Sequence, residues 1–88
     1  MEIEFDAAKR DITLQERGLD LADAGQIFSG IHATRTDNRK DYGEPRFQTF
    51  GFLYGHAAVV VWTPRGQVRR IISLRYAHEH EAKAFGLG

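Results

Sequence analysis

The stretch from His56 to Ala77 reads HAAVVVWTPRGQVRRIISLRYA and predicts a β-hairpin. Its first part, Ala57 to Trp62, is an unbroken apolar run rich in β-branched valine, which is typical of a strand buried in a sheet. Thr63 to Gly66 then provide a turn, because proline presets φ and glycine permits positive φ. Val68 to Leu74 returns as the second strand. The fold is therefore expected to be built around an antiparallel strand pair.

Three arginines, Arg69, Arg70 and Arg75, lie in this hairpin among residues that favour burial. A guanidinium group beside a hydrophobic core is costly to desolvate, so its presence invites a functional explanation. The alternative is that each arginine points to solvent from an uncovered face of the sheet. In a regular strand Arg69, Ser73 and Arg75 share one face, and Arg70 lies on the other face with Leu74. A β-bulge at the doubled arginine would change this arrangement.

The composition is that of one small globular domain spanning residues 1–88. A chain of 88 residues has a thin core, so a bound partner would add stability. There is no cysteine, and the longest apolar run is far too short to span a membrane. The first residues lack the basic segment and the long apolar stretch of a signal peptide. We therefore predict a cytoplasmic protein, without a cofactor.

Charge is distributed unevenly along the chain, although the net charge is zero. Residues 1–34 contain seven acidic and three basic side chains, whereas residues 35–88 contain nine basic and five acidic ones. Such asymmetry favours a sheet that offers a positive face to an anion while acidic helices cover its back. It also fits a solvated surface without a ligand, and the zero net charge argues weakly against a dedicated nucleic-acid binder.

The segment before the sheet predicts one strand and two helices. Glu2 to Phe5 alternates polar and apolar residues as a short strand does. Asp6 is a good N-cap for a first helix, and Gly18 ends this helix as a left-handed cap. The buried side of the first helix is predicted to consist of Ala8, Ile12 and Leu14. Asp20 caps a second helix. Its apolar side is predicted to consist of Leu21, Ala24, Ile27 and Phe28.

Strands dominate the remainder of the chain. Further strands are predicted at 31–36 and 46–54, and a short helix follows the hairpin at 78–85. Residues 37–44 are the most polar run and are predicted to form an exposed, mobile loop. The order β-α-α-β-β-β-β-α predicts an α+β fold. Its antiparallel sheet forms a meander, with the helices segregated to one face and a short helix at the C-terminus.

Familiar metal-binding and catalytic motifs are absent from the sequence. His78 and His80 are two residues apart, so on a helix they do not share a face and cannot bind one metal ion together. The histidine spacing of zincins and a glycine-rich phosphate loop are also missing. A serine–histidine–acid triad cannot be identified. The sequence therefore predicts no metal site.

Arginines on a rigid sheet point instead to a phosphodiester ligand. Each guanidinium fork can make bidentate hydrogen bonds to phosphate oxygens, and can stabilise the extra charge of a pentacoordinate transition state. Arg46 begins a strand that is expected to lie close to the hairpin. Tyr54, Trp62 and Tyr76 could stack an unpaired base, although aromatic residues at such positions more often serve packing.

Two motifs in the hairpin region together indicate a family, and the second of them is the specific one. They are Val59-Val60-Val61-Trp62-Thr63-x-Arg65-Gly66 and Arg70-Ile71-Ile72-Ser73-Leu74-Arg75-x-Ala77. Single residues elsewhere extend the pattern, namely Phe5, Asp6, Lys9, Leu14, Arg17, Gly18, Ala24, Phe28, Glu44, Arg46 and Glu81. In these residues the chain resembles, over nearly its whole length, the BrnT toxins. These are small ribonucleases of type II toxin–antitoxin systems with a RelE-like fold.

This resemblance implies cleavage of RNA without a metal ion. It also implies neutralisation by a BrnA-type ribbon-helix-helix antitoxin in a hetero-oligomer, with DNA contacted only through the antitoxin and no membrane partner. Arg70 and Arg75 correspond to the arginines of the family's Arg-Ile-Ile-Ser-Ala-Arg signature, and they are the candidate catalytic residues. The candidate RNA-binding residues are Lys9, Arg46, Arg69 and Tyr76.

The chain departs from the family pattern at the end of the first helix. Glu16-Arg17-Gly18 stands where the family usually has Lys-His-Gly, so activity is weakened if proton transfer needs that lysine or histidine. His78 or His80 could act as the general base, because imidazole titrates near neutral pH, or could simply be surface residues. The leading interpretation is an endoribonuclease toxin acting on messenger RNA. The alternative is a non-catalytic, toxin-like module that binds an antitoxin or RNA without cleavage.

Overall fold

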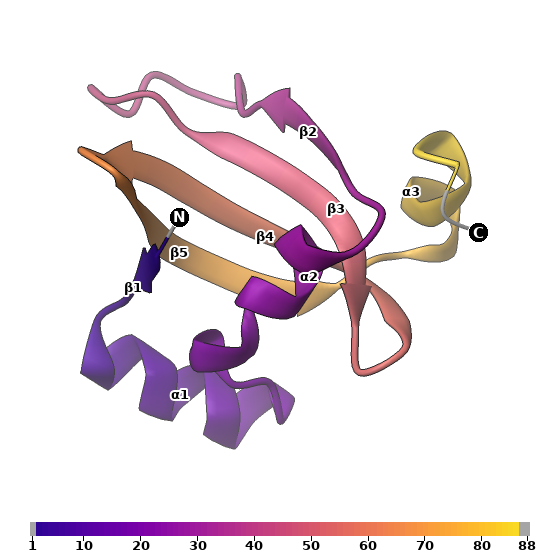
Figure 1. The fold of residues 1–88 in the computed structure, drawn as a ribbon, viewed down its shortest axis with the longest axis horizontal. Helices are drawn as coiled ribbons and strands as arrows, with labels where there is room; N and C mark the ends of the chain where they lie inside the picture. Colours follow the sequence, from indigo (N-terminus) through magenta and orange to yellow (C-terminus); the bar gives the residue numbers. More distant parts are fainter. Residues whose placement is uncertain (1, 87–88) are drawn as a thin grey trace.

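The computed structural model describes residues 2–86, which form a five-stranded sheet with helices around it (Figure 1). The strands are β1 (Glu2–Glu4), β2 (Ala33–Thr36), β3 (Phe47–Leu53), β4 (His56–Arg65) and β5 (Val68–Tyr76). The helical segments are α1 (Ala7–Arg17), the 3-10 turn η1 (Leu21–Asp23), α2 (Gly25–Ser29) and α3 (Glu79–Ala84). None of the helices in this described part of the chain is long and apolar enough to cross a membrane.

The strand order across the sheet is β1-β5-β4-β3-β2. Strands β2 to β5 are antiparallel neighbours, as the sequence predicts. The first strand adds a parallel pair, because Glu2–Glu4 lies beside residues 68–70 of β5. The sheet is therefore mixed, and the fold is α+β. Alternation of polar and apolar residues indicates a strand but not its direction, which is why the parallel pair could not be predicted.

The predicted helix caps are confirmed, and the second helix is divided. Asp6 accepts a hydrogen bond from the Ala8 amide at 2.8 Å, and Gly18 ends α1 with a φ of 68°. Asp20 caps the 3-10 turn η1 through the Ala22 amide at 2.9 Å, and the α-helical part begins only at Gly25. The three residues of η1 and the five of α2 together provide one short apolar segment over the sheet.

The main core lies between this segment and the sheet. Its buried members are Leu19, Leu21, Ala24, Ile27, Leu53, Ala58, Val60, Ile71 and Leu74. Helix α2 approaches β3 closely at Gly51, where a Cβ atom would come within 2.8 Å of the Ile27 side chain. A larger residue at Gly51 would therefore push α2 off the sheet.

Helix α1 is not the amphipathic core helix that the sequence predicts. It has no buried residue, and the side chains of Ile12 and Leu14 are 53% and 44% exposed. Instead, Lys9 Nζ donates to the Ile72 carbonyl at 3.0 Å, and Arg17 Nη1 donates to the Leu74 carbonyl at 2.9 Å. The strand pairing of β1 with β5 extends only to Arg70, so α1 provides hydrogen-bond donors along the rest of this edge.

Candidate functional site

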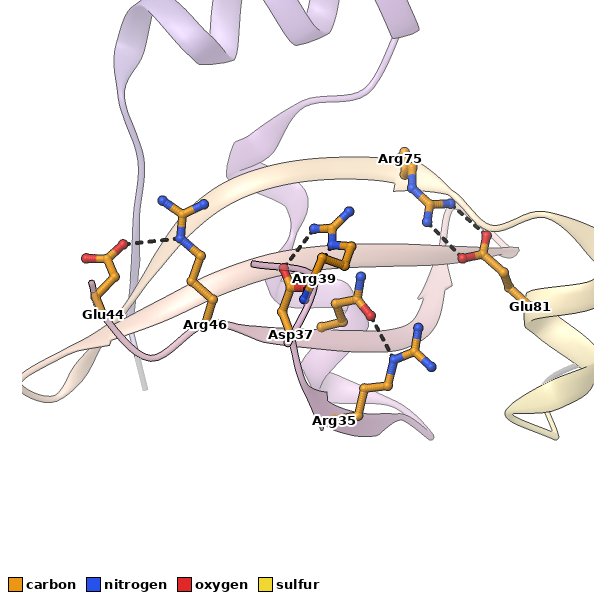
Figure 2. Close-up of polar contacts among 8 residues, drawn as sticks. Arg35, Asp37, Arg39, Glu44, Arg46, Arg75 and Glu81 are labelled. Atoms are coloured by element: carbon orange, nitrogen blue, oxygen red, sulfur yellow. Dashed lines mark hydrogen bonds and ion pairs between the residues drawn. The ribbon is translucent and has the colours of Figure 1, made fainter. Parts of the chain in front are cut away.

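Five arginines lie on the face of the sheet opposite α2, and we call this surface the arginine face. Its members are Arg35 of β2, Arg39 in the following loop, Arg46 before β3, and Arg70 and Arg75 of β5. Figure 2 draws four of them, on neighbouring strands and the loop between them. Neighbours of these residues point the other way: the Phe47 ring packs on Trp62, and Trp62 packs on Phe28 of α2.

A β-bulge in β5 places both candidate catalytic arginines on this face. The pairing partner changes from Ser73 to Ile71 between Val61 and Trp62 of β4, so β5 contains one extra residue. Two positions separated by an odd number of residues can then share a face. Arg69 contacts Phe28 on the α2 side, so its neighbour Arg70 points to the arginine face. The regular-strand arrangement, with Arg69 beside Arg75 and Arg70 opposite, is wrong because of this bulge.

Arg75 is held by a carboxylate from α3. Its Nη1 and Nη2 donate to the two carboxylate oxygens of Glu81, each at 2.8 Å (Figure 2). These hydrogen bonds lower the pKa of Glu81 to about 2 and raise the pKa of Arg75. Glu81 also accepts from the His78 amide at 2.9 Å, which fixes it at the start of α3. The Arg75 side chain is 32% exposed, so its guanidinium is oriented and still reachable by solvent.

Arg39 is anchored in the same way by a buried acid. Its Nε and Nη2 donate to Asp37 at 2.8 and 2.7 Å, and the Asp37 side chain is fully buried. The hydrogen bonds hold the pKa of Asp37 below its usual range, although burial acts in the opposite direction. The Asp37 amide in turn donates to the Arg46 carbonyl at 2.8 Å. The predicted exposed loop therefore begins with a buried residue that ties it to β3.

The other arginines of this face have looser partners. Arg46 donates through Nε to Glu44 at 3.3 Å, and its guanidinium lies 4.0 Å from the centre of the Tyr42 ring. Arg70 Nη1 lies 3.8 Å from Oε1 of Glu4 in β1. These pairs are accessible to solvent, so a phosphate could compete with the carboxylates for the guanidinium groups.

Arg35 differs from the rest because its partners among the described residues are neutral. Its Nε donates to the Gln48 side-chain oxygen at 2.8 Å, and the guanidinium lies over the rings of Phe50 and Phe85, at 5.3 and 5.1 Å. Phe85 follows α3 and stacks on Phe50 with 3.7 Å between the ring centres. Arg35 lines a pocket of about 370 Å³ together with Thr36, Asp37, Asn38, Arg39 and Gln48.

The remaining predicted RNA-binding residues lie off the arginine face. Lys9 is at the β5 edge, where it donates to a backbone carbonyl. Arg69 lies 4.0 Å from the Phe28 ring centre and 5.2 Å from that of Trp62, on the helix side of the sheet. Tyr76 is 41% exposed at the end of β5, with its ring edge-on to His56.

The two other aromatic residues that were candidates for base stacking, Trp62 and Tyr54, both have partners within the protein. Trp62 is partly buried and donates from its indole nitrogen to Thr49 at 2.8 Å, and the Tyr54 hydroxyl donates to Asp23. Both interactions fit a packing role, which is the alternative to base stacking. His78 precedes α3 as its N-cap, and its ring stacks in parallel on that of His80, 5.7 Å away. Within residues 2–86 no three histidine, aspartate or glutamate side chains are grouped so as to hold a metal ion.

Sequence reasoning missed Arg35 and Arg39. Arg39 lies in a polar run that looks like solvated loop, and Arg35 lies in a short edge strand with no motif around it. Arg35 and Ala33 are two residues apart and so lie on the same side of β2, where they pair with Gln48 and Phe50 of β3. That pairing is not evident until the register of β2 and β3 is known.

The sequence of this chain matches a known protein family. A family model described as "Ribonuclease toxin, BrnT, of type II toxin-antitoxin system" matches residues 5–81. The matched range contains all five arginines of the face and ends at Glu81, the partner of Arg75. No curated protein is similar enough to match. Because the family model covers nearly the whole chain, the protein belongs to the BrnT family of ribonuclease toxins of type II toxin–antitoxin systems.

Proposed function

We propose that the protein is a metal-independent endoribonuclease that cleaves messenger RNA on its arginine face and so arrests growth. The observation that carries this proposal is that Arg70 and Arg75 lie on the same face of the sheet because of the β-bulge. The bidentate contact with Glu81 holds the Arg75 fork in a fixed orientation before RNA binds. Preorganised donors of this kind are what transition-state stabilisation requires.

In the proposed reaction the ribose 2′-oxygen attacks the adjacent phosphorus. The 2′-hydroxyl proton passes to a base, the bond to the 5′-oxygen of the next nucleotide breaks, and an acid protonates that oxygen. The products are a 2′,3′-cyclic phosphate and a 5′-hydroxyl end. Arg75 and Arg70 would stabilise the additional negative charge on the pentacoordinate phosphorus, and Arg46 would bind the strand. Glu81 is ionised with a pKa of about 2 and is occupied by Arg75, so it suits positioning better than proton transfer.

We also propose a BrnA-type ribbon-helix-helix antitoxin as the partner, through which alone the protein would contact DNA. A disordered or helical antitoxin segment that folds against the arginine face would neutralise it. An antitoxin that binds the folded protein and not the unfolded chain raises the melting temperature of the protein by linkage. Co-purification with the product of an adjacent gene, with a raised melting temperature, is the expected result. Failure to form such a complex would remove this part of the proposal.

The non-catalytic alternative is favoured by one observation at the end of α1. Arg17 stands where the resemblance implies a histidine, and its guanidinium is committed to the Leu74 carbonyl at 2.9 Å. If proton transfer depends on an imidazole at that position, this protein binds RNA or an antitoxin with weakened cleavage or none.

Cleavage of a labelled single-stranded RNA by the purified protein in excess EDTA separates these functions. The enzyme should produce fragments with cyclic phosphate ends, and expression of the protein alone should arrest growth reversibly while message levels fall. Intact RNA that is nevertheless bound, together with normal growth, would establish the binding module instead.

A further inference from the structure

The pocket beside Arg35 and Arg39 is a separate feature of the arginine face. Its volume is about 370 Å³, and its lining includes the buried side chains of Asp37 and Gln48. Neither of its two arginines belongs to the family-signature pair on β5. The pocket therefore offers additional cationic groups to whatever binds at Arg75.

Arg35 is oriented in this pocket, and its partners among residues 2–86 are neutral. The Gln48 amide oxygen fixes the Nε side of the guanidinium, and the rings of Phe50 and Phe85 hold its plane. In the described part of the chain only Nε of Arg35 donates a hydrogen bond, to Gln48, so its two terminal nitrogens can donate to a ligand. A cation that is held in place while retaining its full charge loses little entropy when it binds an anion.

Arg39 completes the pocket with a second fixed guanidinium. Asp37 occupies its Nε and Nη2, and the Arg39 side chain is 61% exposed, so a ligand from solvent can reach this guanidinium. Its positive charge opposes the rise in the pKa of Arg75 caused by Glu81, so Arg39 is close enough to act electrostatically on Arg75. Arg35 and Arg39 line the same pocket, so their two positive charges together attract a phosphate chain.

The pocket lies across the sheet from Arg75 along a defined path. Arg75 pairs with Val59, Val59 with Phe50, and Phe50 with Ala33 of β2. Neighbouring strands lie about 4.8 Å apart, so this row spans roughly 14 Å between β5 and β2. Arg35 belongs to the adjacent row, opposite Gln48. An extended polyanion such as an RNA strand, whose phosphates are spaced along the chain, can therefore contact Arg75 and Arg35 at the same time.

We infer that the Arg35–Arg39 pocket is a second phosphate subsite, which binds a phosphodiester of the same RNA strand away from the cleaved bond. This inference rests on the proposed function, because the first phosphate is the one held at Arg70 and Arg75. The subsite aligns single-stranded RNA across β4 and β3. It contributes to affinity for long substrates and not to the chemistry at the scissile phosphate.

The test compares two ligands whose attacking hydroxyl is blocked: a 2′-O-methyl dinucleotide with one phosphodiester, and a 2′-O-methyl octanucleotide. Arg35→Gln should weaken octanucleotide binding about tenfold and leave dinucleotide binding unchanged. For the parent, the slope of log affinity against log salt should be roughly −2 to −3, and the variant should lose about 0.7 of that slope. Lys83→Gln removes an equal charge from a side chain that is 69% exposed on α3, and should match the parent.

Two further variants keep the inference open to contradiction. If Arg35→Gln does not fold, Arg39→Gln should show the same weaker binding of the octanucleotide with unchanged binding of the dinucleotide. Arg35→Lys should retain the salt slope, because the charge remains, and should bind RNA with reduced affinity, because the guanidinium fork is lost. Octanucleotide binding like that of the parent in both glutamine variants would overturn the subsite while leaving the proposed function intact. Loss of antitoxin binding with normal RNA binding would also overturn it and assign the pocket to the protein partner. A parent protein that binds neither RNA ligand would instead refute the proposed function and the subsite together.

Discussion

The two faces of the sheet hold their arginines by different physical means. On the α2 side, Arg69 lies against the rings of Phe28 and Trp62, and its Nε is buried without a hydrogen-bond partner among the described residues. On the arginine face, Arg75 and Arg39 are each held by both oxygens of a carboxylate. Aromatic rings make Arg69 part of the packing, whereas carboxylates orient accessible guanidinium groups that a phosphate can also bind.

The largest expected effect follows removal of Arg75. Arg75→Ala should leave the sheet folded and abolish toxicity, because the loss of one preorganised donor costs about 2.7–4 kcal/mol of transition-state stabilisation, or roughly a hundred- to a thousandfold in rate. Arg75→Lys should recover little, since an ammonium group keeps the charge and loses the fork. Single-turnover cleavage rates and growth after induction measure both effects.

The control for Arg75 is Arg10→Ala on α1. Arg10 lies outside the arginine face and pairs with Asp20 at 2.7 and 2.8 Å. This variant should remain toxic even though it loses an ion pair, and its stability is measured by urea unfolding alongside. An Arg75→Ala protein that folds, cleaves RNA and arrests growth like the parent would end the assignment of this residue.

A smaller loss of activity is expected for Glu81→Gln. The glutamine side chain has one acceptor oxygen in place of two, so it cannot accept hydrogen bonds from both Nη1 and Nη2 of Arg75 as the carboxylate does. The guanidinium therefore loses its fixed orientation. A misplacement of about 1 Å can reduce the rate up to about a hundredfold, so we expect a roughly ten- to hundredfold fall in kcat with little change in KM.

A double-mutant cycle distinguishes this positioning role from general damage to α3. If Glu81 acts through Arg75, adding Glu81→Gln to Arg75→Ala should slow cleavage no further. Additive losses in the double variant would show instead that Glu81 contributes independently of Arg75.

Arg69→Met tests the other face of the sheet. Methionine fills much of the same space but removes the cation over the two rings, so the free energy of unfolding should fall by about 1 kcal/mol. Because Arg69 points away from the arginine face, RNA affinity should be unchanged. Urea unfolding and RNA titration give the two values. A loss of RNA affinity without a loss of stability would return Arg69 to the RNA-binding set predicted from the sequence.

The smallest effect concerns acid stability. The pKa of Glu81 in the folded protein is about 2, below its ordinary value, so the Arg75–Glu81 pair contributes stability above the unfolded pKa. This contribution is lost as the pH falls toward 2, and for a solvent-accessible pair it amounts to about 1 kcal/mol. Melting temperatures between pH 5 and pH 2 should therefore fall less for Glu81→Gln than for the parent. Glu79→Gln, which removes an exposed acid of the same helix, should follow the parent curve.

Local sequence pattern was sufficient for much of the fold and for the family. The valine-rich run lies in β4 and the residues after the turn form β5, although β4 continues through the predicted turn residues to Arg65 and the chain reverses at residues 66–67. Asp6 and Gly18 bound α1, and Leu21, Ala24 and Ile27 are buried. These features depend on residues close together in the chain, whose propensities and periodicity can be read directly. The signature that contains Arg70 and Arg75 lies in one strand and was equally readable.

Features that depend on distant segments were not predictable in this way. Both β1 and α1 lie along the edge of β5 that does not pair with β4, and only the assembled sheet shows that this edge is available. The side of the sheet to which Arg69 points depends on the bulge in the pairing of β4 with β5. The pairing of Arg75 with Glu81 and the pocket at Arg35 likewise join separate elements. A run of residues therefore determines which strands and helices form and supplies the arginines. The packing of these elements against one another determines which guanidinium is buried on a ring and which is available to a phosphate, because burial and partners are properties of the assembled surface.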